Sequence, residues 1–310
     1  MTTSFRVSAA TFPILLAGLV LAHFQTPSLK ADEQPATIAV VNGTTITESD
    51  LEFLYLSRDV RDELRPSVRK RYIEQLINRT LLKEFLRARK IKAPESVIKD
   101  RVARAEKLIT QEQLNFDEVL KNLGYTRASF AEEVALPLAW QAHARLAITD
   151  KAIATYWKAN RAKFDGTEVR AAQIVKRVPR EANDDEKKAL INTLSEIRQT
   201  ILDKKTTFSE AAAENSDSPS GKDGGNLGQF AFRGRMPQDL TKVAFALKTG
   251  EVSEPFETPF GVHILTVTEI VPGDLSLEDA RGEIFHELSG KLQTGLIAQL
   301  RDKAEITRPQ

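Results

Sequence analysis

The sequence predicts two domains of different class: an all-α domain, and an α+β domain with a central antiparallel sheet and flanking helices. Apolar residues between 47 and 147 recur at the three-to-four-residue spacing of amphipathic helices. The segment 167–178 alternates as a strand does, and 255–258 and 262–270 are two further β-prone runs. A chain of 310 residues with 41% hydrophobic residues is long enough for two such domains.

The composition excludes several classes of function. Lys and Arg number 44 against 43 Asp and Glu, so no bulk charge would attract nucleic acid. The absence of Cys excludes a disulfide framework, a thiol nucleophile and a Cys-based zinc site. The 4 His residues are scattered without metal-ligand spacing. We therefore expect no metal and no other cofactor.

The first residues are typical of a secretory signal peptide, which we assign to residues 1–31. Arg6 supplies the positive charge, residues 12–22 form a short apolar run, and Ala31 precedes a polar stretch. The run is well short of the ~20 apolar residues that span a bilayer. Cleavage after Ala22, or an uncleaved signal, is the alternative. Export of a chain without Cys indicates a bacterial cell envelope or periplasm, with membrane contact only through the signal peptide.

The mature chain is predicted to open with a β-hairpin. Residues 38–41 form an apolar β-prone run, and residues 44–46 form the return strand. Asn42-Gly43 between them is the strongest two-residue hairpin signal.

Helices follow over residues 47–147. Thr47 and Asp50 form a capping box at the start of the first helix. Breaks at Pro94, at Asn115 and in the stretch "LGYTRASF" divide the region into about four helices.

The α+β region is predicted to have the element order β-α-α-loop-α-β-β. Its elements are a strand at 167–178, a helix at 183–202, a shorter helix from the Thr207/Glu210 capping box, a glycine-rich loop, a helix at 236–252 that Gly250 ends, and strands at 255–258 and 262–270.

The loop "NSDSPSGKDGGNLGQF", residues 215–230, raises three hypotheses. A phosphate loop is unfavourable, because its glycines would have to follow a strand and open a helix, whereas this stretch follows a helix. A hydrolase using Ser218, His263 and Asp217 is also unfavourable, because no G-x-S-x-G elbow is present. The third hypothesis is an apolar pocket bordered by the loop.

The third hypothesis agrees with a resemblance. The segments "VRAAQIV" (169–175), "FSEAAAENSDSPSGKDGGNLGQFAFRGRM" (208–236) and "AFALKTGEVSEPFETPFGVHIL" (244–265) follow one another in the order of a known family. In these motifs the chain resembles the parvulin-type (PpiC-like) peptidyl-prolyl cis/trans isomerases, or rotamases. The resemblance implies a parvulin domain over residues 166–272 and isomerase activity toward X-Pro bonds.

The resemblance also implies the residues of the site. The catalytic positions correspond to Gln173, Ser218, Thr258 and His263, and the proline-binding positions to Leu227, Met236 and Leu240.

Three of these positions depart from the family pattern. Gln173 stands where the family usually has its first His, Ser218 at the Cys/Asp position, and Leu240 at the pocket aromatic. Gln still offers a donor and an acceptor, and Ser is small and polar. Two functions stay open: an active isomerase that helps exported proteins fold, and a chaperone (holdase) with a degenerate, non-catalytic parvulin domain.

The rest of the chain is similar to exported chaperone-foldases of the SurA and PrsA type. The stretch "VVNGTTITESDL" and the helices after it carry this resemblance, which implies unfolded or newly exported polypeptides as partners. The domain would comprise residues 33–165, completed by a C-terminal helix over 275–305. That helix has an apolar stripe, which we expect to pack on the N-terminal helices. Dimerisation through the stripe is the alternative, so the oligomeric state stays open.

Overall fold

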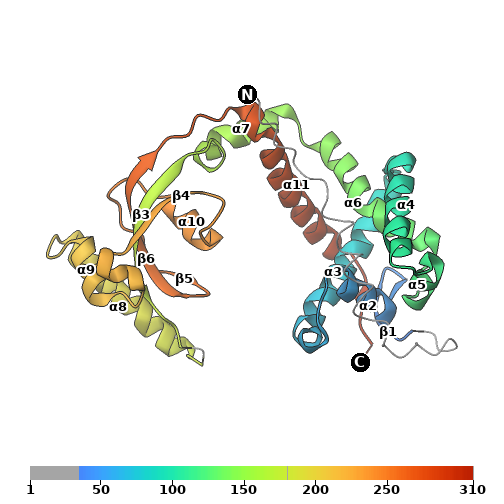
Figure 1. The fold of residues 1–310 in the computed structure, drawn as a ribbon, viewed down its shortest axis with the longest axis horizontal. Coiled ribbons are helices and arrows are strands. Elements are labelled where there is room, and N and C mark those ends of the chain that lie inside the picture. Colours follow the sequence, from blue (N-terminus) through green and yellow to red (C-terminus); the bar gives the residue numbers. More distant parts are fainter. Residues whose placement is uncertain (1–34, 180, 310) are drawn as a thin grey trace. The chain divides into compact units, whose positions relative to one another are not determined.

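The computed structural model describes residues 35–179 and 181–309, which fold into two compact units (Figure 1). Unit 1 contains the described residues up to Thr149 together with those from Leu288 onward. Unit 2 is the intervening segment Asp150–Glu287. No helix in the part of the chain described here is long and apolar enough to cross a membrane.

The domain boundaries drawn from the sequence stay predictions. They assign residues 33–165 and 275–305 to one domain and 166–272 to the other, whereas the two units divide at 149/150 and 287/288. The signal peptide assigned to residues 1–31 lies outside the described residues.

Unit 1 consists of helices and one small sheet. Its elements are β1 (Thr37–Val41), β2 (Thr44–Thr47), α2 (Glu48–Ser57), the 3-10 helix η1 (Asp62–Leu64), α3 (Arg65–Ala88), α4 (Glu95–Gln111), α5 (Phe116–Asn122), α6 (Arg127–Ala147), β7 (Ile306–Thr307) and the C-terminal part of α11 (Leu277–Arg301). The described residues from 47 to 147 therefore form five α-helices, where the sequence predicted about four. The additional break follows α2, where Asp59 has a φ of 50° and Pro66 opens the first turn of α3.

The predicted hairpin is confirmed. Val41 pairs with Thr44, and Asn42 and Gly43 have φ values of 48° and 83°, as a two-residue turn of this kind requires. The strand order of the small sheet is β2-β1-β7, so a two-residue strand near the C-terminus pairs with β1. The sequence analysis did not predict this third strand.

Helices α2 and α3 of unit 1 pack against the hairpin. One apolar cluster joins buried side chains of β1, β2, α2 and α3, and Leu300 of α11 packs against it. The predicted capping box at the start of α2 is present, because the Asp50 carboxylate accepts hydrogen bonds from the backbone N–H and the hydroxyl of Thr47, both at 2.8 Å. Trp140 of α6 donates its indole N–H to the Ser289 hydroxyl of α11 at 3.0 Å. The C-terminal part of α11 is thus held on the N-terminal helices.

Unit 2 is an α+β fold, as the sequence predicted. Its elements are α7 (Asp150–Asn160), η2 (Arg161–Lys163), β3 (Glu168–Lys176), α8 (Asp184–Leu202), α9 (Phe208–Asn215), η3 (Pro219–Asp223), β4 (Asn226–Ala231), α10 (Gln238–Ala244), β5 (Phe256–Thr258), β6 (Gly261–Val271) and the start of α11. The sheet is antiparallel, with strand order β4-β3-β6-β5.

Two details of the sequence prediction for unit 2 are wrong. The glycine-rich loop contains the edge strand β4, whose polar and glycine-containing sequence hides its strand character. The helix expected over 236–252 ends at Ala244, and Thr249 and Val252 instead form isolated β-bridges with Val267 and Thr266 of β6.

The sheet of unit 2 is covered on both faces. Ala171 and Leu265 belong to an apolar cluster on the α10 side, whereas Ile174 and Ile264 belong to a cluster with α8 and α9 (Figure 1). Successive residues of β3 and β6 therefore alternate between two cores. Every candidate site residue that is apolar lies in the cluster on the α10 side.

Candidate active site

The centre of the candidate site is His263 on β6. Strand pairing aligns His263 with Val175 of β3 and with Phe256 of β5. Gln173 lies two residues before Val175, so its side chain is on the same face of the sheet. Thr258 closes the β5–β6 hairpin opposite Gly261. The sheet register thus brings together three of the four residues that the sequence proposed as catalytic.

These three side chains form a hydrogen-bonded chain. His263 Nδ1 lies 3.0 Å from Gln173 Oε1, and His263 Nε2 lies 2.8 Å from Thr258 Oγ1. Because the amide oxygen can only accept, Nδ1 carries the ring proton and Nε2 accepts from the Thr258 hydroxyl. The Thr258 oxygen in turn accepts the backbone N–H of Phe260 at 3.1 Å. Each hydrogen-bonding ring atom of the imidazole has a partner.

The imidazole is kept uncharged. His263 is 4% exposed, and burial lowers its pKa to about 4. The ring of Phe256 stacks on it with centroids 5.5 Å apart and an interplanar angle of 22°. At neutral pH the site therefore presents a neutral polar group inside an apolar setting.

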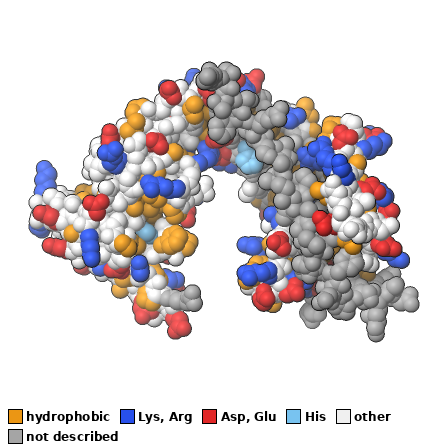
Figure 2. Space-filling view, viewed as in Figure 1, with side chains coloured by type: hydrophobic (Ala, Val, Ile, Leu, Met, Phe, Trp, Pro, Cys, Tyr) orange, Lys and Arg blue, Asp and Glu red, His pale blue; other side chains and the backbone are white. Residues whose placement is uncertain are grey.

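The three proposed proline-binding residues share one apolar cluster. Leu240 of α10 is buried within it at 4% exposure, and Leu227 and Met236 are partly buried against it. Phe256 belongs to the same cluster, so the cluster extends to the His263 ring. Figure 2 shows hydrophobic side chains gathered on the surface of this unit. Leu240 is thus buried inside the apolar cluster, whereas the side chains of Leu227 and Met236 are partly exposed to solvent.

Arg235 connects the segments that carry Leu227 and Met236, the two partly buried members of this cluster named above. Its Nη2 atom donates to the backbone carbonyls of Leu227, at 2.9 Å, and Gln229, at 3.1 Å. Arg235 is adjacent to Met236 in the chain, so one guanidinium holds the backbone of β4 beside Leu227 to the segment that carries Met236. The sequence analysis missed this residue, because nothing in its local pattern shows that its partners are carbonyl oxygens.

The glycine-rich loop lets two backbone segments approach closely. The carbonyl of Gly225 accepts the backbone N–H of Gln173 at 2.9 Å. A Cβ at Gly225 would lie 2.3 Å from the Gln173 carbonyl oxygen, and its φ of 81° also favours glycine. The glycine therefore positions the strand that carries Gln173.

Ser218 is not part of the hydrogen-bonded chain. It caps η3, and its hydroxyl lies 3.0 Å from that of Ser220. Within the described residues, no hydrogen bond joins Ser218 to the other three proposed catalytic residues. Its neighbour Asp217 accepts the backbone N–H of Arg177 at 2.8 Å. These contacts leave Ser218 without a base, which excludes the arrangement of a Ser-His-Asp hydrolase.

The described residues offer no metal centre. No group of three or more His, Cys, Asp or Glu side chains among them could hold a metal ion.

Comparison with known proteins identifies the family. A family model described as a PPIC-type PPIASE domain matches residues 174–269, and one described as a SurA-like N-terminal domain matches residues 1–144. The peptidyl-prolyl cis-trans isomerase Pin1 of Arabidopsis thaliana is 39% identical over 82 residues, which cover 26% of this chain and 68% of that protein. The chain belongs to the PpiC-type peptidyl-prolyl isomerase family. The resemblance noted in the sequence is thereby confirmed.

Two further relatives carry names of foldases or peptidylprolyl isomerases. The foldase protein PrsA of Bacillus subtilis (strain 168) is 35% identical over 147 residues, covering 47% of this chain and 44% of that relative. The match thus spans less than half of the curated relative. A crystal structure of the peptidylprolyl isomerase PrsA from Bacillus anthracis aligns with 74% of this chain and 96% of its own, at 21% identity and a TM-score of 0.46.

Proposed function

We propose that this chain is a peptidyl-prolyl cis/trans isomerase that assists the folding of newly exported polypeptides. The observation that carries the proposal is the neutral chain Gln173–His263–Thr258 beside the apolar cluster of Leu227 and Met236. Membership of the PpiC-type family supports the same reaction.

The reaction needs no nucleophile. Rotation about an X-Pro bond has a barrier of ~18–20 kcal/mol, because the planar amide is stabilised by charge-separated resonance. Water stabilises that planar form more than an apolar site does, so a desolvated amide twists more easily. An apolar pocket for the proline ring, lined beside the amide by neutral polar groups, would desolvate the amide in this way. A charged imidazole would stabilise the charge-separated planar amide and so oppose the twist. The lowered pKa of His263 prevents that charge at neutral pH.

A protease-coupled assay on a proline-containing tetrapeptide tests the proposal. We expect the full chain to accelerate isomerisation, and the substitutions His263→Gln and Met236→Ala to lower kcat/KM at least tenfold, which corresponds to ~1.4 kcal/mol of transition-state stabilisation. His286→Ala, at an exposed histidine of the same unit, is the matched control and should leave the rate unchanged. Circular dichroism confirms that each variant stays folded.

The alternative is a holdase with a non-catalytic PpiC-type domain. Two features favour it: Ser218 lies outside the hydrogen-bonded chain, and Leu240 offers no aromatic surface to a proline ring. An isomerisation rate at the thermal background, together with suppression of the aggregation of an unfolded client, would select this alternative.

Export is part of the proposal. It is supported by Arg6 and the apolar run 12–22 at the start of the sequence. The expected location is the periplasm or cell envelope. N-terminal sequencing of the protein recovered from its native envelope should then begin between residues 23 and 37, and intact Met1 in the cytosol would contradict export.

A further inference from the structure

Phe256 is an aromatic side chain of the site to which the proposed reaction gives no role so far. It lies on β5 and pairs with His263 of β6 across the hairpin. Its ring stacks on the imidazole, with centroids 5.5 Å apart and an interplanar angle of 22°. Because Phe256 and Thr258 are two residues apart on one strand, both side chains lie on the face of the sheet that carries His263. Phe256 therefore adjoins the hydrogen-bonded chain directly.

The same side chain belongs to the apolar cluster. Phe256, Leu227 and Met236 are partly buried residues that pack against the cluster containing Leu240. Leu227 lies on β4 and Phe256 on β5, which are the two edge strands of the sheet. Because Phe256 is partly exposed, part of its surface is open to a ligand. Phe256 thus joins the polar part of the site to its apolar part.

Other phenylalanines of this region are placed differently. Phe232 is 7% exposed, so it offers little surface to a ligand. Phe245 is partly buried and packs edge to face on Phe232, with centroids 5.2 Å apart. Phe260 lies at the tip of the β5–β6 hairpin and is 65% exposed, so most of its side chain is unpacked. Phe256 combines contact with the imidazole, membership of the cluster and partial exposure.

An aromatic ring suits a proline ring. The pyrrolidine ring is apolar, and its C–H groups can lie against the electron-rich face of an aromatic side chain. Grooves that bind proline-rich peptides are accordingly lined with aromatic residues. Leu227 and Met236 supply apolar contact without such a face, and Leu240 is buried. Phe256 alone among the residues named for this cluster offers an aromatic surface beside the neutral imidazole.

We propose that Phe256 contacts the proline ring of the substrate and supplies the aromatic part of the proline-binding surface, together with Leu227 and Met236. The identity of the ligand rests on the proposed isomerase function. The aromatic surface comes from β5 instead of α10, where Leu240 offers none. The site then selects proline over an open-chain residue, because a residue without the ring loses the contact with Phe256.

NMR titration of the full chain with the peptide N-acetyl-Ala-Ala-Pro-Ala-amide tests the contact without relying on catalysis. An aromatic ring shifts the signals of protons held against its face upfield. We expect the ring protons of the bound proline to move upfield. We also expect the matched peptide with alanine in place of proline to bind about threefold more weakly or worse. Proline signals that do not move upfield, or equal affinity for the two peptides, would overturn the proposal.

Variants assign the contact to Phe256. Phe256→Leu keeps an apolar side chain beside His263 but removes the aromatic ring, so we expect most of the upfield shift to be lost and the affinity to fall about threefold to tenfold. Phe256→Tyr keeps the ring and should retain both. Phe208→Leu is the matched control, because Phe208 is partly buried in the same unit but packs against the cluster on the opposite face of the sheet. Unchanged shift and affinity in Phe256→Leu, with its fold confirmed by circular dichroism, would contradict the assignment.

The tetrapeptide assay separates this inference from the proposed function. We expect Phe256→Leu to raise KM and to change kcat little. Acceleration by the wild type with an unchanged KM in Phe256→Leu would leave the isomerase function standing and overturn the role of Phe256. Upfield proline signals without acceleration would do the reverse. If Phe256 served only to cover His263, Phe256→Leu would move the pKa of His263 toward its ordinary value and leave the proline signals in place.

Discussion

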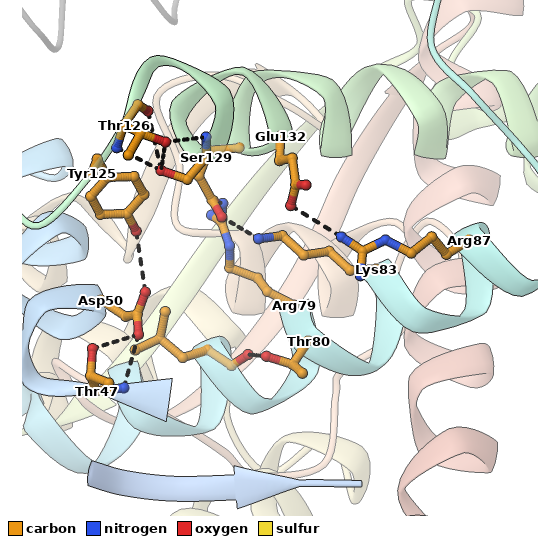
Figure 3. A network of polar contacts seen from close by, with 12 residues as sticks. Thr47, Asp50, Arg79, Thr80, Lys83, Arg87, Tyr125, Thr126, Ser129 and Glu132 are labelled. Carbon is orange, nitrogen blue, oxygen red and sulfur yellow. Dashed lines mark hydrogen bonds and ion pairs between the residues drawn. The ribbon is translucent and has the colours of Figure 1, made fainter. Parts of the chain in front are cut away.

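The two units bury polar side chains in opposite ways. In unit 2, His263 is neutral, and each ring nitrogen has one uncharged partner within hydrogen-bonding distance. In unit 1, Arg79 and Lys83 are partly buried cations that both pair with one carboxylate, Glu133 (Figure 3). A satisfied neutral network leaves an uncharged site, whereas two cations that share one carboxylate depend on that carboxylate for their stability. The neutral site of unit 2 suits an uncharged amide.

Removing the shared carboxylate should have the largest effect. Glu133→Gln leaves two partly buried cations without their counter-charge, and breaking a buried ion pair in this way costs about 3–5 kcal/mol of stability. Glu132→Gln, which breaks the exposed pair with Arg87, should cost less than about 1 kcal/mol. Urea denaturation followed by circular dichroism measures both. Similar losses in the two variants would show that burial does not distinguish the pairs.

The pH dependence of stability should reveal the neutral histidine. The pKa of His263 is about 4 in the folded chain, whereas the ordinary pKa of histidine is 6.5, so between these pH values the unfolded chain binds a proton that the folded chain does not. Stability contributed by His263 is therefore present above pH 6.5 and is lost as the pH falls toward 4. Gln173→Glu places a carboxylate beside Nδ1 and should raise the pKa of His263 by roughly 1–3 units. NMR titration of the ring protons checks both values, and an unchanged pKa in the variant would contradict the contact with residue 173.

The smallest effect is expected at Arg235. Arg235→Ala removes the hydrogen bonds to the carbonyls of Leu227 and Gln229, each worth about 1 kcal/mol. The backbone beside Leu227 is then no longer held to the segment that carries Met236. We expect KM for the tetrapeptide to rise about threefold to tenfold with kcat little changed. Arg235→Lys keeps one donor and should restore part of the loss. A lower melting temperature with unchanged KM would show that Arg235 supports only the fold.

Much of the local structure could be predicted because its causes are local. The Asn42-Gly43 turn depends on two residues that accept positive φ, and the capping box of Thr207 and Glu210 depends on one side chain reaching a backbone N–H three residues away. The start of α8 after Asn183 follows from the same chemistry. Such signals survive in any tertiary context.

The sequence analysis missed elements that form only because a segment far away in the chain pairs with them. β7 is a two-residue strand near the C-terminus, and its strand character exists only because β1 is available to pair with it. β4 contains glycine and polar residues, and it is a strand because β3 lies beside it. The role of Phe256 follows from the hairpin register, in which it faces His263; counting outward from the turn at 259–260 could have found it.

The sequence by itself determined the two fold classes, because these follow from periodicity and turn residues. Its motifs also indicated the family and the candidate site residues, through their resemblance to the parvulin-type isomerases. Only the tertiary structure decided how those residues are related. It joined Gln173, His263 and Thr258, left Ser218 outside, and buried Leu240. The physical reason is that a hydrogen bond, a lowered pKa and a shared counter-charge each depend on distance and burial, which arise only when segments far apart in the chain pack together.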